Sequence, residues 1–318
     1  MVGASAHGVL AAGQEREGVA AVAVVAQAGL EAHPFLLSDL RGDESVAGEE
    51  IAARLGGSPR PEDLVVLLPD PSVLQAGPLL EGLRASLEPA RIVGAGAASA
   101  LSEAPLQWCG RSVHSGALAG IAFRAARPPR LGVTQACRPV TDLLCVTGSR
   151  GNWILELEGR PAIEVYREVA RAPLAADLRR AAAFLLVALP CEEALRPGGY
   201  RVRSVVGFSP ERAGFALPEA VRTGDRIALA LREPEAARED IKAMLAELGD
   251  AAPAFGLYLN CCARGASLFG VAGLEAAYLE QAFGESPIAG MFGSCEIGPI
   301  GGRTELLTYT GVLALLDE

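Results

Sequence analysis

A glutamate stands among small and apolar residues near the end of the sequence. Glu296 lies in the stretch from Met291 to Gly302, which is otherwise composed mostly of glycine and apolar side chains. A buried carboxylate is costly unless a cation or hydrogen-bond donors compensate it. Glu296 therefore has two interpretations: it anchors the ammonium group of a ligand, or it pairs with an arginine or main-chain N–H groups of the protein itself.

An arginine in a second loop suggests a partner for this glutamate. Arg264 precedes Gly265, and its planar guanidinium can hold a carboxylate through two parallel hydrogen bonds. If Arg264 and Glu296 line one pocket, they would hold opposite ends of a zwitterion, and an α-amino acid would be a natural ligand. If they contact each other instead, they form a structural ion pair. The sequence leaves both alternatives open.

Two adjacent cysteines come just before that arginine. Cys261 and Cys262 follow a predicted strand, and neighbouring strand residues point to opposite faces, so at most one of them is expected to face a pocket. A nucleophilic cysteine needs a cation near its thiolate and usually a base, but all three histidines lie in the first half of the chain. We expect structural thiols; the alternative is a hydrolase that depends on Cys261 or on the carboxylate of Glu296.

Composition narrows the class of protein. The chain has 318 residues, enough for two domains, with 50% hydrophobic residues and a net charge of -10. The negative charge and the lack of Lys/Arg blocks argue against nucleic acid and anionic membrane surfaces as partners. No apolar run is long enough to predict membrane insertion, and the N-terminus does not resemble a signal peptide. We expect a bacterial, cytoplasmic protein.

Neither a metal nor a cofactor is expected. The seven cysteines are scattered, with no C-x-x-C pair and no histidine near them, so zinc templates fail. GAGAAS (94–99) superficially resembles a dinucleotide-binding loop, but a serine replaces the third glycine and no clear helix begins there. No complete catalytic motif is present, and we assign no catalytic residue.

Hydrophobic periodicity predicts strands and helices along the whole chain. Strands are expected at 63–71, 91–97, 117–126, 133–140, 200–208, 225–233, 255–262 and 308–316. Helices are expected at 72–87, 162–170, 174–187, 238–248 and 273–284. This mixture lacks the strict alternation of a dinucleotide fold and predicts an α/β, mixed α+β protein with mixed sheets flanked by helices.

Two features concern the organisation of the chain. The segment CEEALRPGGY (191–200) combines charge, proline and paired glycine, and we expect a domain boundary near residue 195. VGASAHGVL (2–10) echoes VGAGAASAL (93–101), which favours an internal duplication within the first domain.

Four segments together resemble the FIST family. VTQACRPVTDLLCVTGSRGNWILELEGRPAIEVYREV (133–169) resembles the end of the FIST N-terminal domain, and YRVRSVVG (200–207) the opening of the C-terminal domain. LNCCARGASLFG (259–270) is similar to the Cys-x-Gly-Arg-Gly loop of the family, and AGMFGSCEIGPIGG (289–302) to its Gly-Glu-Ile-Gly-Pro loop. The matches occur in the expected order and cover nearly the whole chain.

The resemblance implies a stand-alone sensory module for signal transduction, with a FIST N-type domain at 1–195 and a FIST C-type domain at 196–318. Its partners would be a small ligand, such as an amino acid, and a signalling protein. We place the ligand near the interdomain cleft. The expected ligand-binding residues are Cys261, Arg264, Gly265, Glu296, Gly298 and Pro299, and the candidates for lining the cleft are Arg138, Asn152 and Arg203.

Three departures from the family pattern bear on that expectation. The chain begins late, at a turn that family members reach after an additional strand and helix. Cys295 replaces the glycine before Glu296, and Ala263 replaces the glycine of the Cys-x-Gly-Arg loop. Because alanine and cysteine tolerate positive φ poorly, we expect altered loops. A shortened N-terminus would also suit an interaction scaffold with an exposed sheet edge.

Overall fold

The structure is a computed structural model that describes residues 1–18, 21–24, 30–38, 40–99, 103–191, 195–196 and 198–317. The chain divides into two compact units: unit 1 comprises Met1–Thr134 and Ile241–Glu318, and unit 2 comprises Gln135–Asp240. Both ends of the chain therefore build unit 1. Unit 2 is inserted between them in the sequence.

The first sheet of unit 1 is built largely from the N-terminal segment. Its strands lie in the order β23 (Arg303–Leu307), β22 (Glu296–Ile300), β6 (Arg91–Ala95), β5 (Asp63–Pro69), β9 (Leu118–Arg124) and β4 (Glu31–Leu37). β5 and β6 are parallel and joined by α2 (Ala76–Leu87), whereas the other neighbours are antiparallel. The sheet is therefore mixed, as the sequence predicts.

The second sheet of unit 1 takes half of its strands from the C-terminal segment. Its strands lie in the order β10 (Arg130–Gln135), β24 (Thr310–Leu316), β20 (Phe255–Cys261), β21 (Ile288–Gly293), β2 (Gly8–Ala11) and β3 (Gln14–Glu17). β20 and β21 are parallel, and between them the chain forms α6 (Ala266–Phe269) and α7 (Leu274–Phe283). β1 (Val2–Ala4), β7 (Gln107–Cys109) and β8 (Ser112–His114) form a small separate sheet.

The two large sheets repeat the same plan. In each, a parallel pair joined by a helical connection (β5–β6, β20–β21) is flanked by one antiparallel strand (β9, β24) and extended by a hairpin (β22–β23, β2–β3). Unit 1 is thus internally duplicated. The echo at 2–10 and 93–101 does not mark this duplication: its first copy falls on β1 and β2, and its second begins in β6.

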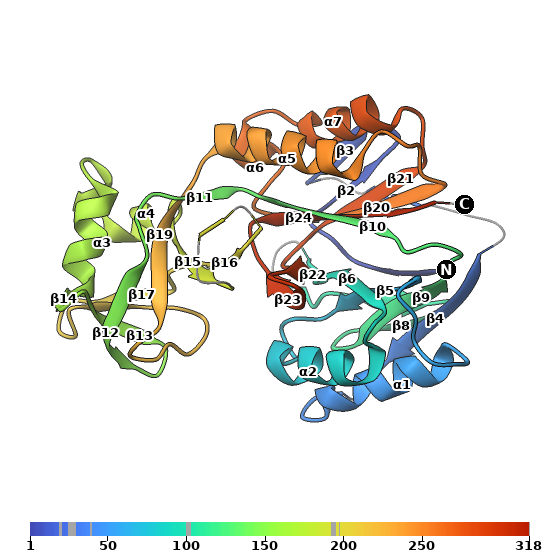
Figure 1. Ribbon diagram of the computed structural model, residues 1–318, viewed down its shortest axis with the longest axis horizontal. Coiled ribbons are helices and arrows are strands. Elements are labelled where there is room, and N and C mark those ends of the chain that lie inside the picture. The colour runs from blue at the N-terminus through green and yellow to red at the C-terminus, as the bar shows by residue number, and fades with distance from the viewer. Residues whose placement is uncertain are drawn as a thin grey trace. The chain divides into compact units, whose positions relative to one another are not determined.

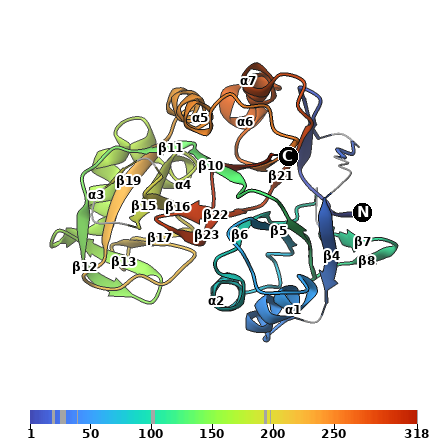
Figure 2. The same cartoon turned by 45° about the vertical axis from the view of Figure 1, so that its right-hand side comes forward.

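Unit 1 has four layers, with helices outside and sheets inside (Figure 1). The sheets are stacked, since β6 contacts β20, β21 and β24. α1 (Ala47–Arg54) and α2 cover the first sheet, and their apolar residues pack on strand residues such as Val65 and Leu67. α7 and α5 (Pro234–Leu248), which enters unit 1 at Ile241, cover the second (Figure 2). Continuous apolar runs on central strands such as β5 and β24, which are buried on both faces, and an apolar face on the helices favour this arrangement.

Unit 2 is an antiparallel sheet with short helices. Its strands lie in the order β16 (Tyr200–Arg203), β15 (Leu185–Pro190), β19 (Arg226–Arg232), β12 (Leu144–Arg150), β13 (Trp153–Leu157), β18 (Gly214–Ala216) and β17 (Gly207–Ser209). β11 (Cys137–Pro139) pairs with β19, and β14 (Arg160–Pro161) with β13. α3 (Ala162–Ala170) and α4 (Leu178–Ala181) pack their apolar residues on the sheet, and the Tyr166 hydroxyl donates to the Leu185 carbonyl at 2.6 Å.

The predicted fold class is confirmed: the protein is a two-part α/β, mixed α+β protein with mixed sheets and flanking helices. One predicted element is wrong. The segment 174–187 was expected to be a helix, but only short helical turns precede β15 there. LLVALP is a continuous apolar run, and periodicity cannot distinguish a buried strand from a buried helix of that length.

The expected boundary near residue 195 does not coincide with a limit of the compact units, which meet after residue 134 and after residue 240. The described residues of 191–200 connect β15 to β16 within unit 2, with the Cys191 N–H donating to the Gly199 carbonyl at 2.8 Å; the rest of this segment lies outside the described residues. As a boundary between sequence domains, residue 195 stays a prediction. In the described part of the chain, no helix is long and apolar enough to cross a membrane.

Candidate functional site

The loops that carry Cys261, Arg264 and Glu296 meet in unit 1. β20 and β21 are parallel neighbours, so their carboxyl ends lie at one edge of the sheet, with Cys261 opposite Gly293 in the register. The Cys262 N–H donates to the Gly293 carbonyl at 2.8 Å, and β22 begins three residues later at Glu296. Loops at the carboxyl ends of parallel strands are where α/β proteins commonly bind ligands. We call residues 261–266, 293–296 and 309–310 the edge site.

Gly265 shapes the first loop of the edge site. Its backbone has φ 56° and ψ -143°, a conformation that is nearly confined to glycine. A Cβ atom here would lie 2.4 Å from Oε1 of Glu17. That same oxygen accepts the Ala266 N–H at the start of α6, at 3.0 Å. Gly265 is therefore required for the turn, and its position gives no evidence of a ligand contact.

Arg264 is fully buried and forms an ion pair inside the protein. Its Nη2 and Nε donate to Oε1 of Glu275 at 2.6 and 3.0 Å, and Glu275 is buried as well. The Tyr258 hydroxyl donates to Oε1 of Glu275 at 2.8 Å, and the Asn260 amide donates to Oε2 at 2.6 Å. The Arg264 guanidinium also lies 5.9 Å from the centre of the Phe269 ring. This network joins β20 to α7.

Glu296 is fully buried and incompletely paired. Its Oε2 accepts the Thr310 hydroxyl at 2.7 Å and the Thr310 N–H at 3.3 Å, while its Oε1 is buried without a hydrogen-bond partner. Burial, and next the charge of Cys261, raise the pKa of Glu296 well above its ordinary value. The neutral acid is therefore favoured, and it presents an unused oxygen or hydroxyl inside the edge site.

The two adjacent thiols of the edge site differ in character. The Cys261 thiol is 4% exposed and its sulfur accepts the Tyr309 N–H at 3.3 Å; its hydrogen bond to Cys262, and then burial, raise its pKa well above the usual value. Cys262 is half-buried, and the same hydrogen bond lowers its pKa. The expectation that at most one of the two side chains faces a pocket stays a prediction. In the described residues, no group of His, Cys, Asp and Glu is arranged to hold a metal ion.

The two replaced glycines do not strain the loops. Neither Ala263 nor Cys295 is among the described residues with positive φ, so the family's glycine is not needed for backbone conformation at either position. Cys295 is buried, which raises the pKa of its thiol to about 12. Its sulfur would lie 2.6 Å from a Cβ at Gly96, and the Gly96 N–H donates to the Cys295 carbonyl. The loops from the two halves of unit 1 therefore pack closely here.

Gly298 and Pro299 lie farther along β22. A Cβ at Gly298 would lie 2.9 Å from Val312, so this glycine permits close packing of β22 on β24. Pro299 lines a hollow of about 700 Å³ that also contains three arginines, Arg84, Arg91 and Arg303. This hollow has the charge to attract an anion.

The three residues expected to line a cleft have partners within unit 2. Arg138 pairs with Glu233 at 2.7 Å, the Asn152 amide donates to the Leu217 carbonyl at 2.7 Å, and Arg203 Nε donates to Glu219 at 2.7 Å. Asn152 holds the turn between β12 and β13, as expected for Asn beside Gly. Each residue therefore has a structural role, and a role in lining a cleft stays a prediction.

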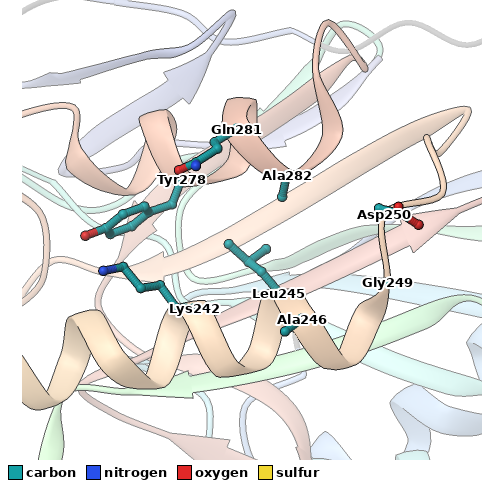
Figure 3. Close-up of a pocket in the computed structure, with 8 residues that line it drawn as sticks. All are labelled: Lys242, Leu245, Ala246, Gly249, Asp250, Tyr278, Gln281 and Ala282. Atoms are coloured by element: carbon teal, nitrogen blue, oxygen red, sulfur yellow. The ribbon is translucent and has the colours of Figure 1, made fainter.

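A shallow groove runs between α5 and α7 on the outer surface of unit 1 (Figure 3). Its volume is about 720 Å³. The Lys242 ammonium lies 5.3 Å from the centre of the Tyr278 ring, and Leu245 and Ala282 are among the apolar residues of its surface. Lys242 and Asp250, the charged residues of the groove, are exposed to solvent.

Sequence reasoning missed several members of the edge site and its supporting network. Glu275 lies in the helix expected at 273–284 but was given no role, and Cys262 was not among the expected ligand-binding residues. Thr310 and Tyr258 were read only as strand residues. Only the pairing of strands distant in sequence, such as β20 with β24, brings these residues together. A glutamate in the first turn of α7, 11 residues after Arg264, is the one signal that was available.

Two family models match this chain in succession. The FIST N domain matches residues 1–160 and the FIST C domain matches residues 162–299. The chain belongs to the FIST family. The FIST N match covers residues 1–134 of unit 1 and the start of unit 2, and the FIST C match covers unit 2 from residue 162 onward together with residues 241–299 of unit 1. FIST domains are sensory modules for small ligands in signalling proteins.

Mycobacterial proteins resemble this FIST chain along its whole length. The uncharacterized protein Rv0628c of Mycobacterium tuberculosis (strain ATCC 25618 / H37Rv) is 28% identical over 328 residues, covering 100% of this chain and 84% of the relative. The uncharacterized protein Mb0898c of Mycobacterium bovis (strain ATCC BAA-935 / AF2122/97) is 29% identical over 327 residues, covering 100% of this chain and 83% of the relative.

Proposed function

We propose that this FIST protein is a cytoplasmic sensor of an amino-acid-like ligand, which binds at the edge site and alters the contacts of the sensor with a signalling partner. Family membership supports the sensory role. The seven cysteines are free thiols, a state that a reducing cytoplasm maintains.

One observation carries the location: Oε1 of Glu296 is buried and has no hydrogen-bond partner. An unsatisfied buried polar atom costs about 1–3 kcal/mol, and a site that binds a ligand is one reason to retain it. The atom lies among Gly-rich loops at the carboxyl ends of β20 and β21, where a ligand would meet main-chain N–H groups.

The ligand chemistry follows from what surrounds this carboxyl group. The Arg264 guanidinium forms an ion pair with Glu275. Of the two residues that the sequence suggested as holders of a zwitterion, Glu296 is therefore the one left to contact the ligand. Because burial favours the neutral acid, a ligand ammonium that approaches Glu296 would stabilise its ionised form and displace its proton. Binding of an amino acid should therefore release a proton.

Signalling requires that the ligand prefer one of two conformations. With Glu296 fully buried, the structure represents a closed state of the edge site. Binding would favour a state in which the loops at 262–266 and 293–296 separate enough to admit the ligand.

The experiment is a thermal-shift screen of the purified chain against amino acids and small carboxylates. A ligand present at about 100 times its dissociation constant adds about 2.7 kcal/mol of stability, or roughly 5–10 °C for a protein of this size. Hits are titrated by calorimetry in buffers of different ionisation enthalpy, which reports the proton that Glu296 releases.

Variants locate the site. Glu296→Gln should abolish the shift and the proton release, whereas Glu285→Gln, at an exposed position, should preserve both. If Arg303→Ala removes the shift and Glu296→Gln does not, the ligand binds in the arginine hollow and the edge-site assignment is wrong. A saturable shift for no compound in the screen would contradict the amino-acid-like ligand.

A further inference from the structure

Three arginines from distant parts of the sequence line one hollow of unit 1. Arg84 belongs to α2, Arg91 begins β6 and Arg303 begins β23, and one strand, β22, lies between β6 and β23. We call this the arginine hollow. Its volume of about 700 Å³ falls in the range of pockets that hold small molecules, about 300–1,000 Å³.

A tight turn fixes where β23 and its arginine begin. Gly301 and Gly302 have φ of 55° and 75°, and a two-residue hairpin turn of type I′ requires positive φ at both positions. Arg303 follows this turn at once. Arg303 and Arg91 are exposed, and the side chain of neither forms a hydrogen bond or an ion pair with another described residue. Their guanidinium donors are therefore available to a ligand.

The third arginine is held by the same hairpin. Nη1 of Arg84 donates to the Thr304 carbonyl at 2.9 Å and lies 3.8 Å from Oε1 of Glu305. These contacts involve one nitrogen of a guanidinium group that has five N–H donors. Arg84 is half-buried, so it is an oriented cation beside the two exposed ones.

The charge of the hollow indicates what it would hold. Among the described residues, three arginines and one glutamate, Glu88, give its lining a formal charge of +2, on a chain whose net charge is -10. A phosphate monoester dianion balances that charge and offers three terminal oxygens, one for each guanidinium. A carboxylate has a single charge and two oxygens, which one arginine can satisfy.

We propose that the arginine hollow binds a small phosphorylated compound and that Arg84, Arg91 and Arg303 hold its phosphate group. The ester portion of the compound would lie on the apolar lining, which includes prolines and aliphatic side chains. The lining residues in the described part of the chain include no aromatic ring on which a base could stack. The ligand is therefore a non-aromatic phosphate ester and not a nucleotide.

This site is distinct from the edge site. Arg91 lies at the amino end of β6, whereas Ala95, at the carboxyl end of β6, is paired with Glu296 of the edge site. Five residues of a strand span about 14 Å, so one small ligand cannot occupy both places. The protein would therefore respond to a phosphorylated compound independently of the ligand at the edge site.

The experiment measures binding to the full chain by calorimetry at low ionic strength, with no amino acid present. The probes are glycerol 3-phosphate, inorganic phosphate and succinate. Glycerol 3-phosphate should bind saturably and at least about tenfold more tightly than succinate, a dianion whose charges sit on two carboxylates. Succinate binding of equal strength overturns the assignment to phosphate, and tighter binding of inorganic phosphate overturns the assignment to an ester.

Variants of the lining test the contacts. Arg91→Gln and Arg303→Gln should each weaken binding of glycerol 3-phosphate about tenfold or more, because each removes charge-assisted hydrogen bonds to the phosphate. Glu88→Gln should strengthen binding about twofold or more, because it removes the carboxylate that repels the ligand. Damage to the fold would not produce such a gain. Unchanged affinity in both arginine variants overturns the proposal.

The matched control is an exposed arginine of unit 1 outside the hollow. Arg111→Gln, in the turn between β7 and β8, should bind glycerol 3-phosphate as the unmodified chain does. A loss as large as that of Arg303→Gln would show general attraction of anions and overturn the site. Because phosphate compounds test this site and amino acids test the edge site, either proposal can fail without the other.

Discussion

Two fully buried glutamates of unit 1 are compensated differently. Glu275 accepts hydrogen bonds from Arg264, Tyr258 and Asn260, so its charge is balanced within the protein. Glu296 has Thr310 as its hydrogen-bond donor and burial favours its neutral form. Substitutions at the two positions should therefore have different effects: loss of the cation beside Glu275 should lower stability, and loss of the Glu296 carboxyl group should change how stability depends on pH.

At the first glutamate, Glu275, loss of the paired cation can be tested with Arg264→Met. This variant should lower the free energy of unfolding by about 3–5 kcal/mol, because it leaves the Glu275 carboxylate buried without its cation. Arg264→Met combined with Glu275→Gln should recover part of this loss, since glutamine carries no charge and still accepts from Tyr258. Urea denaturation measures both. A loss of less than about 1 kcal/mol for the single variant would mean that the pair has little importance for the fold.

At the second glutamate, Glu296→Gln should make the free energy of unfolding less dependent on pH. An unfolded glutamate loses its proton near its ordinary pKa, whereas the folded protein retains it up to the raised pKa of Glu296. The unfolded state therefore binds fewer protons in this window, and the free energy of unfolding falls as pH rises, by about 1.4 kcal/mol per pH unit.

Below the window, the stabilisation from the neutral acid is fully present; above the folded pKa, it is lost. The measurement is the difference in unfolding free energy between the unmodified chain and Glu296→Gln from pH 4 upwards. A difference that stays constant with pH would show that the pKa of Glu296 is not raised.

At the scale of elements, one hairpin holds the helices of the second sheet. β3 carries Glu15 and Glu17. Glu15 accepts the N–H groups of Gly273 and Ala276 at the start of α7, both at 2.9 Å, and Glu17 accepts the Ala266 N–H at the start of α6. Carboxylates at helix N-termini satisfy main-chain donors and interact favourably with the helix dipole.

Glu15→Ala should therefore lower the free energy of unfolding by about 1–2 kcal/mol, because two N–H groups at the start of α7 lose their acceptor. Thermal or urea denaturation reports this change. Glu285→Ala, an exposed glutamate beyond the end of α7, serves as the control and should change stability by less than about 0.5 kcal/mol. Equal effects in the two variants would argue against the capping role.

At the scale of the whole molecule, unit 2 is an insertion into a duplicated scaffold. In the N-terminal half of unit 1, β4 is followed by α1, β5, α2 and β6; in the C-terminal half, β10 is followed, after unit 2, by α5, β20, α7 and β21. The chain leaves and re-enters unit 1 at neighbouring points, since the Gln135 N–H donates to the Asp240 carboxylate at 2.6 Å. Each unit has its own apolar core.

Replacing residues 135–240 with a flexible linker of about six residues should therefore leave a folded unit 1, because the ends to be joined are close. Trp108 is the tryptophan of unit 1 and Trp153 that of unit 2, so fluorescence of the shortened chain follows unit 1 alone. A cooperative unfolding transition is expected. A broad, non-cooperative transition would contradict an independent unit 1.

The sequence by itself determined the family, the fold class and most of the elements. Local apolar periodicity identified strands such as 63–69 and helices such as 162–170 and 274–283, because it depends only on neighbouring residues. The motif loops around Arg264 and Glu296 were found from their residue types and from the family resemblance, and the structure places both in the same unit.

Only the tertiary structure decided which residues those loops contact. Arg264 pairs with Glu275, and no local pattern favours this partner over Glu296, because partners of a buried charge are selected by strand pairing and helix packing across the chain. The apolar run at 185–190 became a strand because β16 and β19 lie on both sides of it. The duplication, too, lies in strand order and direction, which are properties of hydrogen bonding between distant segments and leave no local pattern in the residues.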